Sequence, residues 1–406
     1  MAPGFFPLDD ELALLPGRLT PRLHEWVVRL ATWMPFAATT DCLAWLARTT
    51  LSPATAQRLT TAAGQAAVTV QTAAAAQLAH DLPPAPCAPA RLVVSVDGAM
   101  VPVRGDRPWR EVKTMVIGTP RMIMVDGMEV VQTQDLSYFS RMMDATTFAD
   151  LALVETHRRG LDSAGAVAAV ADGAAWIQGF VDLHCPDALR ILDFPHASGY
   201  LAQIGDLVFG ASSSASHAWQ DTQRQQLKTV GAVPVLATIS DLMERATDAD
   251  AFATAQQYLT QRQGHMDYPS FQAAGWPIGS GMVESANKLV VEARMKGSGM
   301  HWDEDNVNGM LALRNAVCND RWDAVWAEIC VARRAAAQTA RWERQQQRRP
   351  PPPVPTAQPQ PSIPTSTHLS AEVLAQIAEP PGVHPWRRAF SVKRQTELAD
   401  ARAQDA

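Results

Sequence analysis

The chain has 406 residues, of which 47% are hydrophobic and 19% charged, and its 35 Lys and Arg against 41 Asp and Glu give a formal net charge of −6. This length and apolar content exclude a wholly disordered protein and allow two or three packed units. The acidic excess excludes a protein that binds nucleic acid over its whole surface by bulk positive charge, but it allows a local basic groove.

The cysteines and the N-terminus indicate the compartment. The five cysteines form no C-x-x-C pair and are odd in number, so neither a disulfide framework nor a thiolate zinc site is indicated. The stretch MAPGFFPLDDELALL has acidic residues where a signal peptide needs basic ones, and no run of about twenty apolar residues follows it. We therefore expect a soluble cytoplasmic protein with no membrane partner.

Residues 1–80 are predicted to form a helical domain, because apolar residues recur at helical spacing through LHEWVVRLATWM and DCLAWLARTT. Ser52 is a candidate N-cap for a short helix that ends at Gly64, and an Ala/Gln-rich helix follows. Two short helices with a tight turn resemble a DNA-binding helix-turn-helix in which residues 53–63 read the DNA. An ordinary helical hairpin is the alternative. The Pro-rich stretch 81–89 predicts a domain boundary.

From residue 90 to 198 the pattern is that of strands joined by turns and helices. Strands are predicted at 91–103, 109–118, 121–140, 166–171 and 188–193, and helices at 144–160 and 179–184. Three hairpin-linked strands followed by two strands reached through helices predict a mixed sheet covered by helices, an α+β fold. This order of elements is that of a ribonuclease H-like core.

The remaining chain divides into four predicted parts. Residues 199–268 are expected to be a helical insertion, and 269–300 to return to the core with a loop, YPSFQAAGWPIGSG, and a helix that carries Glu284. C-terminal helices with an Arg-rich end are expected over 301–349. The proline content of 350–406 predicts a linker and tail.

Three carboxylates are candidate site residues. Asp97 follows an apolar run and precedes Gly98, and Asp172 has the same setting before Gly173. A carboxylate at the end of a buried strand, next to a small residue, is held in place and leaves room for a ligand. Glu284 stands in the first turn of a predicted helix after a G-S-G loop. Two unrelated turns and a Glu that only starts a helix are the structural alternatives.

Carboxylates in this number suit phosphodiester chemistry assisted by two metal ions. One ion lowers the pKa of the attacking water or 3′-hydroxyl and the other holds the leaving oxygen, with the ions about 3.5–4 Å apart. Hard divalent cations prefer oxygen ligands, so Asp and Glu favour two Mg²⁺ or Mn²⁺ ions. Clustered carboxylates repel one another, and bound cations relieve this repulsion.

Several sequence blocks resemble a known family. They are V-D-G-A-M-V-P-V-R, V-A-D-G-A-A-W-I, L-D-F-P-H-A, G-W-P-I-G-S-G-M-V-E-S-A-N-K, A-R-M-K-G-S-G-M-H-W and L-R-N-A-V-C-N-D-R-W. Together they resemble the ISKra family of bacterial insertion-sequence transposases, a DDE family related to the Mutator-like group. The resemblance implies a ribonuclease H-like catalytic core and a catalytic, metal-binding triad of Asp97, Asp172 and Glu284. Longer members of the family carry an additional N-terminal segment with paired zinc-binding cysteines, which is not found here.

Asp193 and His196, in the block D-F-P-H, match an aspartate/histidine motif of Mutator-like transposases. His196 would position DNA or protonate a leaving oxygen, and a structural histidine bonded to a carboxylate is the alternative. Asp193 competes with Asp172 as a metal ligand because both end a predicted strand. We favour Asp172, because its Asp-Gly setting repeats that of Asp97.

Cationic and aromatic residues after Glu284 are candidate DNA contacts. Lys288, Arg294 and Lys296 would hold the phosphate backbone, and Trp302 would stack on a frayed base. A salt-bridge role for Lys288 and a core position for Trp302 are the alternatives. Residues 331–349 contain six Arg and one Glu, a further candidate for phosphate binding.

The sequence thus predicts a DDE transposase that cleaves and joins insertion-sequence DNA with two Mg²⁺ or Mn²⁺ ions. Its expected partners are the element ends and the target DNA. A homodimer or larger assembly is expected, because two ends must be held together, and so is a nucleoid-associated location in the cytoplasm. The alternatives are a ribonuclease H-like nuclease without strand transfer and a non-catalytic DNA-binding remnant that represses its own element.

Overall fold

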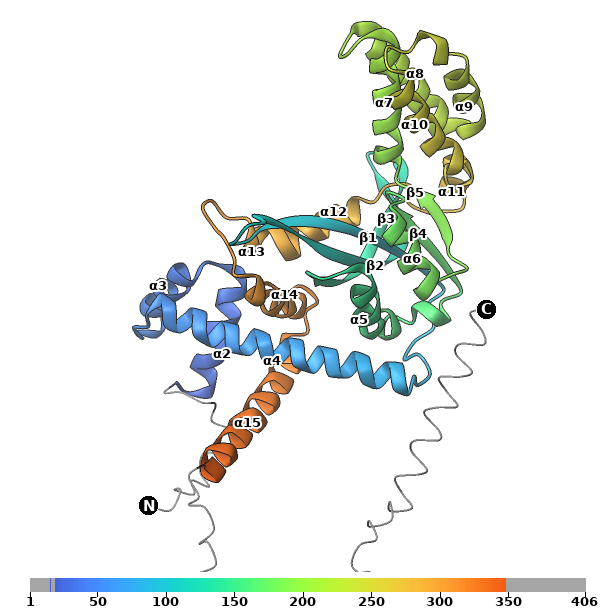
Figure 1. Cartoon of the computed structure of the whole chain (residues 1–406). Coiled ribbons are helices and arrows are strands. Elements are labelled where there is room, and N and C mark those ends of the chain that lie inside the picture. The colour runs from blue at the N-terminus through green and yellow to red at the C-terminus, as the bar shows by residue number, and fades with distance from the viewer. Residues whose placement is uncertain (1–14, 16–18, 348–406) are drawn as a thin grey trace, which may run out of the picture. The chain divides into compact units, whose positions relative to one another are not determined.

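The computed structural model describes Leu15 and residues 19–347, and the described residues up to Gln346 form one compact unit (Figure 1). At its centre is a five-stranded sheet with helices packed on both faces. The linker and tail predicted over 350–406 lie outside the described residues. No helix in the described part of the chain is long and apolar enough to cross a membrane.

The strand order of the sheet is β3-β2-β1-β4-β5. The strands are β1 (Arg91–Pro102), β2 (Trp109–Val125), β3 (Met128–Arg141), β4 (Ala166–Ala171) and β5 (Leu189–Leu192). The first three are antiparallel neighbours, whereas β4 is parallel to β1 and β5 is parallel to β4. The mixed α+β class expected from the order of hairpins and helical crossovers is confirmed.

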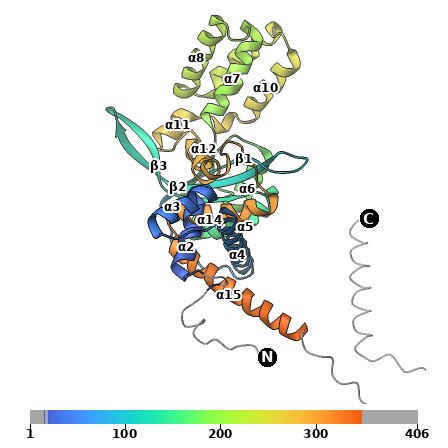
Figure 2. The ribbon, with the colours of Figure 1, turned by 90° about the vertical axis from the view of Figure 1, so that its left-hand side faces the viewer.

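The hairpin of β2 and β3 departs from the prediction. β2 continues beyond the predicted strand 109–118 to Val125, and Asp126 and Gly127, with φ of 50° and 79°, form the turn to β3. Asp-Gly favours such two-residue turns because both residues take positive φ. The segment 121–140, predicted as one strand, is therefore shared between two. Figure 2 shows the tip of this hairpin extending beyond the other strands.

Side chains alternate along β1 between two faces of the sheet. The even-numbered face packs on α5 (Ala145–Arg158) and α6 (Ala175–His184) through Leu92, Val94 and Val96. The odd-numbered face is shared by two further cores. Val93 packs with the helices that follow β5, and Ala99 and Val101 pack with the helices that follow residue 280. Asp97 lies on this odd-numbered face, between the two cores.

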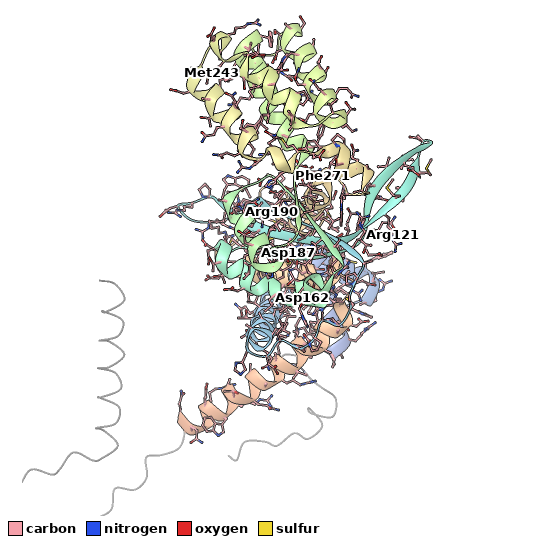
Figure 3. The ribbon with its side chains drawn as sticks, turned by 90° about the vertical axis from the view of Figure 1, so that its right-hand side faces the viewer. Arg121, Asp162, Asp187, Arg190, Met243 and Phe271 are labelled. Carbon is pink, nitrogen blue, oxygen red and sulfur yellow. The ribbon has the colours of Figure 1, made fainter. Side chains whose placement is uncertain are left out.

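The residues predicted as a helical insertion form α7 (Phe194–Phe209), α8 (Ser214–Thr229), α9 (Ala232–Ser240) and α10 (Ala249–Gln261), with short 3-10 turns η2 (Met243–Arg245) and η3 (Gln263–His265). The first helix starts earlier than expected because Asp193 caps it. The following segment, predicted as loop, contains the short helix α11 (Tyr268–Ala273). Figure 3 shows Phe271 of α11 where these helices meet the sheet, and Met243 at their far end.

The N-terminal residues form α2 (Pro21–Trp33), α3 (Phe36–Ala47) and α4 (Pro53–His80). Ser52 caps α4 as predicted, because its hydroxyl accepts the Thr55 N–H at 3.2 Å. The helix does not end at Gly64. A Cβ at Gly64 would lie 2.7 Å from the backbone of Gly309, so this glycine serves a close helix contact instead of a cap. α4 also packs against α2, α3 and α5, within the same unit as the sheet.

The C-terminal part begins with one interrupted helical run. It consists of α12 (Gly281–Ala286), a π-helical segment η4 (Asn287–Glu292) and α13 (Ala293–Met295). The long helices α14 (Glu304–Cys318) and α15 (Trp322–Gln347) follow, and a 3-10 turn η1 (Leu161–Ser163) lies before β4. The predicted helix after the G-S-G loop therefore exists, but with a π segment in its middle that the sequence did not indicate.

Candidate active site

Strand register brings Asp97 and Asp172 to one edge of the sheet. Val94 of β1 pairs with Ala169 of β4, and each Asp stands three residues after its member of that pair. The carboxyl ends of parallel neighbours meet at the same edge, so the two carboxylates are at equivalent positions on adjacent strands. Only Asp172 follows the end of its strand, since β4 ends at Ala171. Asp97 does not end its strand, because β1 continues, paired with β2, to Pro102, close to the predicted end at residue 103.

Asp97 is half buried, and both its oxygens accept one hydrogen bond. Its Oδ1 accepts the Gly98 N–H at 2.7 Å and its Oδ2 accepts the Asn287 side-chain amide at 3.0 Å. Burial raises the pKa of Asp97, and the negative charges of Asp172 and Glu284 add to this rise, while the two hydrogen bonds oppose it. The three predicted carboxylates are therefore close enough for their charges to interact.

Gly98 has a different role from the one predicted. The sequence suggested that its small size leaves room for a ligand. A Cβ at this position would instead collide with the Glu111 side chain, which occupies the opposite face of the sheet from Asp97. Glu111 forms an ion pair with Lys113 at 2.6 Å. Gly98 thus accommodates a neighbouring ion pair and not a ligand.

Asp172 stands in the turn between β4 and α6. Its Oδ1 accepts the Ala174 N–H at 2.9 Å, and its carboxylate is partly exposed. The backbone carbonyl of Asp172 accepts a hydrogen bond from the Tyr258 hydroxyl, and that of Gly173 accepts one from Arg262 at 2.9 Å. The turn is therefore contacted by α10 and by the residue that follows it, both from the helical insertion.

Glu284 is exposed and lies one turn before Asn287. Residues three apart share a face of a helix, so the Asn287–Asp97 hydrogen bond turns the face that carries Glu284 toward β1. The π segment starts at Asn287, whose Oδ1 is buried without a hydrogen-bond partner among the described residues. Single π turns inside α-helices occur frequently at functional sites.

Asp193 is buried, at 5% exposure, and both its oxygens are used to hold backbone. Oδ2 accepts the His196 N–H at 3.0 Å and caps α7, and Oδ1 accepts the Ser280 N–H at 2.6 Å. Asp193 thus joins the start of the insertion to the loop that precedes Glu284. This geometry favours Asp172 over Asp193 as the residue available to a metal ion, because Asp193 is buried with both oxygens bonded, whereas Asp172 is partly exposed and has one oxygen without a hydrogen bond to the described residues.

His196 is partly buried among aromatic rings. Its ring lies 5.4 Å from Tyr200 and 5.7 Å from Tyr258, both edge-on. The structural alternative, a side chain of His196 bonded to a carboxylate, is not what the structure shows: the bond to Asp193 comes from the His196 backbone. His196 lies near the Asp172 turn through Tyr258, which contacts both.

The donor set suits hard cations, but the three carboxylates do not form one compact cluster. Within the described ranges, no three His, Cys, Asp or Glu side chains lie close enough to hold a single ion together. A two-ion site does not need three carboxylates around one ion, because one carboxylate can bind both ions and each of the others can bind one. The charges of both Asp172 and Glu284 raise the pKa of Asp97, so the three carboxylates interact electrostatically. Oxygen ligands of this kind suit Mg²⁺ or Mn²⁺.

The four predicted DNA contacts fall into two groups. Lys288 and Lys296 are exposed, and Lys296 pairs with Glu292 at 2.7 Å. Arg294 and Trp302 are instead buried, at 3% and 8% exposure. The expectation that Trp302 stacks on a frayed base is therefore not supported by its position, which is the core position named as the alternative.

The reason lies in how Arg294 is packed. Its guanidinium lies 5.0 Å from the Trp302 ring and 5.1 Å from that of Phe36, and its Nε donates to the Ala31 carbonyl at 2.7 Å. The Trp302 indole donates to the backbone at 3.2 Å. Arg294 therefore ties the N-terminal helices to the helical run that carries Glu284. Burial lowers its pKa to about 10, which leaves it charged at neutral pH.

Sequence reasoning missed Asn287, Tyr258 and Arg262. Asn287 stood inside the block E-S-A-N-K, but nothing in its spacing indicated a contact with a residue 190 positions earlier. Tyr258 and Arg262 lay in a segment read only as helical. A signal was present in part: Tyr and Arg at positions i and i+4 share a helix face.

No protein-family model matches the sequence, and no curated protein is significantly similar to it. The fold and site described above therefore carry the functional argument.

Proposed function

We propose that this chain is a DDE transposase of the ISKra type, with Asp97, Asp172 and Glu284 as its catalytic carboxylates. The observation that carries the proposal is their convergence from three separate elements. Strand register places the two Asp side by side, and Asn287 links Asp97 to the helical run of Glu284. The mutual effect of their charges on Asp97 supports the same grouping.

The sheet supports a ribonuclease H-like core. Three antiparallel strands followed by two parallel ones, in the order β3-β2-β1-β4-β5, are the arrangement that the sequence led us to expect for this fold. Asp97 lies on the central strand β1, and Asp172 follows the carboxyl end of its parallel neighbour β4. Open sheets that contain parallel strands commonly bind ligands at that end.

When bound, Mg²⁺ or Mn²⁺ would activate a water or a DNA 3′-hydroxyl for attack and would stabilise the leaving oxygen. The chain's own residues hold the site. Asn287 fixes one oxygen of Asp97, and the backbone of Gly98 fixes the other. Asp193 anchors the loop before Glu284. His196 is near enough to the Asp172 turn to orient DNA or donate a proton to a leaving oxygen.

A DNA-contacting surface is proposed on α4 and the loop before α14. The exposed side of α4 presents Gln57, Arg58, Thr61 and Gln65, which are side-chain types that bind bases and phosphates. A neighbouring cavity of about 440 Å³ is lined in part by polar residues: Gln57 and Thr61 of α4, Arg104 after β1, His301 in the loop before α14 and Asn306 in α14. Lys288 and the exposed Arg341 and Arg344 of α15 add positive charge elsewhere.

Of the two alternatives for residues 1–80, we propose the DNA-binding one, with the N-terminal part of α4, which includes the predicted reading segment 53–63, as the DNA-facing element. The proposed partners are the element ends and target DNA, bound by a homodimer or larger assembly at the nucleoid in the cytoplasm. The alternatives differ in chemistry: a nuclease would cleave without joining, and a repressor would bind DNA without cleaving it.

Metal-dependent cleavage tests the proposal. Purified protein with Mg²⁺ is expected to cut DNA that carries the element ends, and Asp97→Asn should lower the rate at least about 100-fold, since metal ligation supplies several kcal/mol. Asp187→Asn is a matched control, because this exposed residue precedes β5 at the opposite edge of the sheet. Equal cleavage by all three proteins would refute the assignment of Asp97.

A further inference from the structure

The helical insertion reaches the turn that carries Asp172. The Tyr258 hydroxyl donates to the Asp172 carbonyl, and Nη2 of Arg262 donates to the next carbonyl, that of Gly173, at 2.9 Å. Within the described part of the chain, no other side chain bonds these two carbonyls. Two consecutive peptide groups beside a candidate metal ligand are thus held from a segment about ninety residues later in the chain.

Within the turn itself, the Asp172 side chain makes one hydrogen bond, in which Oδ1 accepts the Ala174 N–H at 2.9 Å. β4 ends at Ala171, whose carbonyl accepts the Asp193 N–H at 2.8 Å, and the sheet ladder stops there. Gly173 follows with a φ of +77°, a conformation in which glycine is freer than any other residue. A Cβ on Gly173 would lie 2.6 Å from Nε of Arg262, so the glycine also admits the arginine. The contacts from Tyr258 and Arg262 therefore add two bonds to the one local bond that holds the backbone around Asp172.

The two donors are themselves fixed by stacking. The Tyr258 ring lies parallel to that of Tyr200, with centroids 4.1 Å apart and an interplanar angle of 13°. The Arg262 guanidinium lies 3.8 Å from the Tyr258 centroid on a cation-π contact. A stacked ring and a capped guanidinium lose little freedom when they donate, so each is a preorganised donor. Burial raises the pKa of Tyr258 to about 12, so its hydroxyl keeps the proton that it donates.

We infer that Tyr258 and Arg262 are positioning residues that hold the Asp172 turn, so that the insertion completes the candidate active site. The consequence for catalysis rests on the proposed function, whereas the effect on the turn does not. Outer contacts that orient a metal-ligating side chain typically change metal affinity or activity by about 10–100-fold when removed. A change of that size is expected in the metal response, with DNA affinity unchanged.

The test uses the full chain with four variants. Tyr258→Phe removes one hydroxyl and keeps the ring, and Arg262→Gln removes the second donor. Tyr200→Phe is the control, since it keeps the stack and its hydroxyl makes no hydrogen bond within the described residues. Arg262→Lys, which keeps a cation able to donate, should recover part of the loss.

Two readouts separate the contact from its consequence. Hydrogen exchange of the amides at 172–174 should speed up about tenfold or more in Tyr258→Phe and Arg262→Gln, but not in the control. The Mn²⁺ concentration that half-saturates binding and DNA cleavage should rise about tenfold in the same two variants. Thermal unfolding checks that each variant is folded.

Each outcome decides a distinct point. Unchanged exchange in both variants overturns the inference whatever the activity. Faster exchange with an unchanged Mn²⁺ requirement overturns the positioning role and leaves only a structural contact. If wild-type protein neither binds Mn²⁺ nor cleaves DNA, the proposed function fails, and the exchange result alone decides whether the insertion holds the turn.

Discussion

At the scale of single residues, Asp193 shows that a carboxylate can match a catalytic motif while both its oxygens make structural hydrogen bonds. Its oxygens accept two backbone N–H groups from segments far apart in the sequence, His196 and Ser280. Asp193→Asn would replace one acceptor by an amide that donates, so one buried N–H would lose its partner. We expect the free energy of unfolding to fall by about 1–3 kcal/mol in urea denaturation.

The control for this prediction is Asp248→Asn. Asp248 is exposed and caps α10, because its Oδ1 accepts the Ala251 N–H at 3.0 Å. The side-chain oxygen of asparagine can accept the same hydrogen bond. Its stability should stay close to that of wild type. If Asp193→Asn is equally stable but loses Mn²⁺ binding, Asp193 is a metal ligand and the structural role assigned here is wrong.

His24 gives a second prediction at this scale. Burial, with the charges of Arg333 and Arg58, lowers the pKa of His24 to about 4 from the ordinary 6.5. Its Nε2 pairs with Arg333 at 2.7 Å, which suits a neutral ring. Between these two pH values the unfolded chain binds a proton that the folded chain does not. Stability should therefore be full above pH 6.5 and should fall as the pH drops toward 4.

Urea unfolding at several pH values checks this. In His24→Gln the decline over this range should be shallower, with a residual slope from His184 and His265, whose pKa values burial also lowers. Identical slopes in the variant and in wild type would show that His24 is not kept neutral by the fold.

The neighbouring positions of Asp97 and Asp172 could be predicted because a local pattern carried the information. A strand followed by Asp and a small residue is visible in the sequence, and parallel register then places Asp97 and Asp172 together. Asn287 was not predictable in this way, because its contact depends on a π segment and on a strand 190 positions away. The burial of Trp302 agrees with the core position that the sequence analysis gave as the alternative to a DNA contact.

At the scale of elements, α4 and α14 lie in close contact. Gly64 and Gly309 face each other there, and a Cβ on Gly64 would lie 2.7 Å from the Gly309 carbonyl carbon and oxygen. Gly64→Ala must push the helices apart, and we expect a loss of about 1–3 kcal/mol. Differential scanning calorimetry or urea unfolding measures it.

Gly179→Ala is the matched control. Gly179 lies inside α6, and a Cβ there would meet nothing within 4 Å. Alanine has the better helix propensity, so this variant should gain about 0.5–1 kcal/mol. A Gly64→Ala protein as stable as Gly179→Ala would contradict the close packing described here.

Helix α4 and the hairpin of β2 and β3 show why some element boundaries were mispredicted. Glycine after a helical pattern indicates a C-cap, but at Gly64 tertiary packing uses the missing side chain instead. In the hairpin, Pro120 suggested a break before the third strand, but β2 accommodates it and the turn falls at Asp126 and Gly127. In these two cases propensity gave the type of the element and packing decided where it ended, whereas the short helix α11 lies in a segment predicted as loop.

At the scale of the whole molecule, the N-terminal helices are not set apart from the sheet. The sequence predicted a boundary over 81–89, whereas the described residues up to Gln346 form one compact unit. Arg294 and Arg314 account for this in part. They are buried cations that donate to the carbonyls of Ala31 and Thr32 at 2.7 and 3.0 Å, and so bind α2 to the run that carries Glu284. A DNA contact on α4 would thus be rigidly linked to the candidate active site.

The net charge of −6 fits this arrangement. The exposed cations that we propose to contact DNA lie on α4, on α15 and at Lys288. DNA binding should therefore weaken steeply as the salt concentration rises, even though the chain is acidic. Arg58→Gln should lower DNA affinity in a titration at fixed salt and reduce its salt dependence by about one counterion. An unchanged affinity and slope would remove α4 from the proposed DNA surface.

The central claim, that three carboxylates catalyse both cleavage and joining, is tested most directly by strand transfer. Pre-cut element ends with a free 3′-hydroxyl are incubated with target DNA, Mg²⁺ and the full chain, wild type or with Glu284→Gln. The account predicts joined product from wild type and at least about 100-fold less from Glu284→Gln, at equal DNA binding. Equal joining by both proteins, or cleavage by wild type with no joining under any divalent cation, would contradict it.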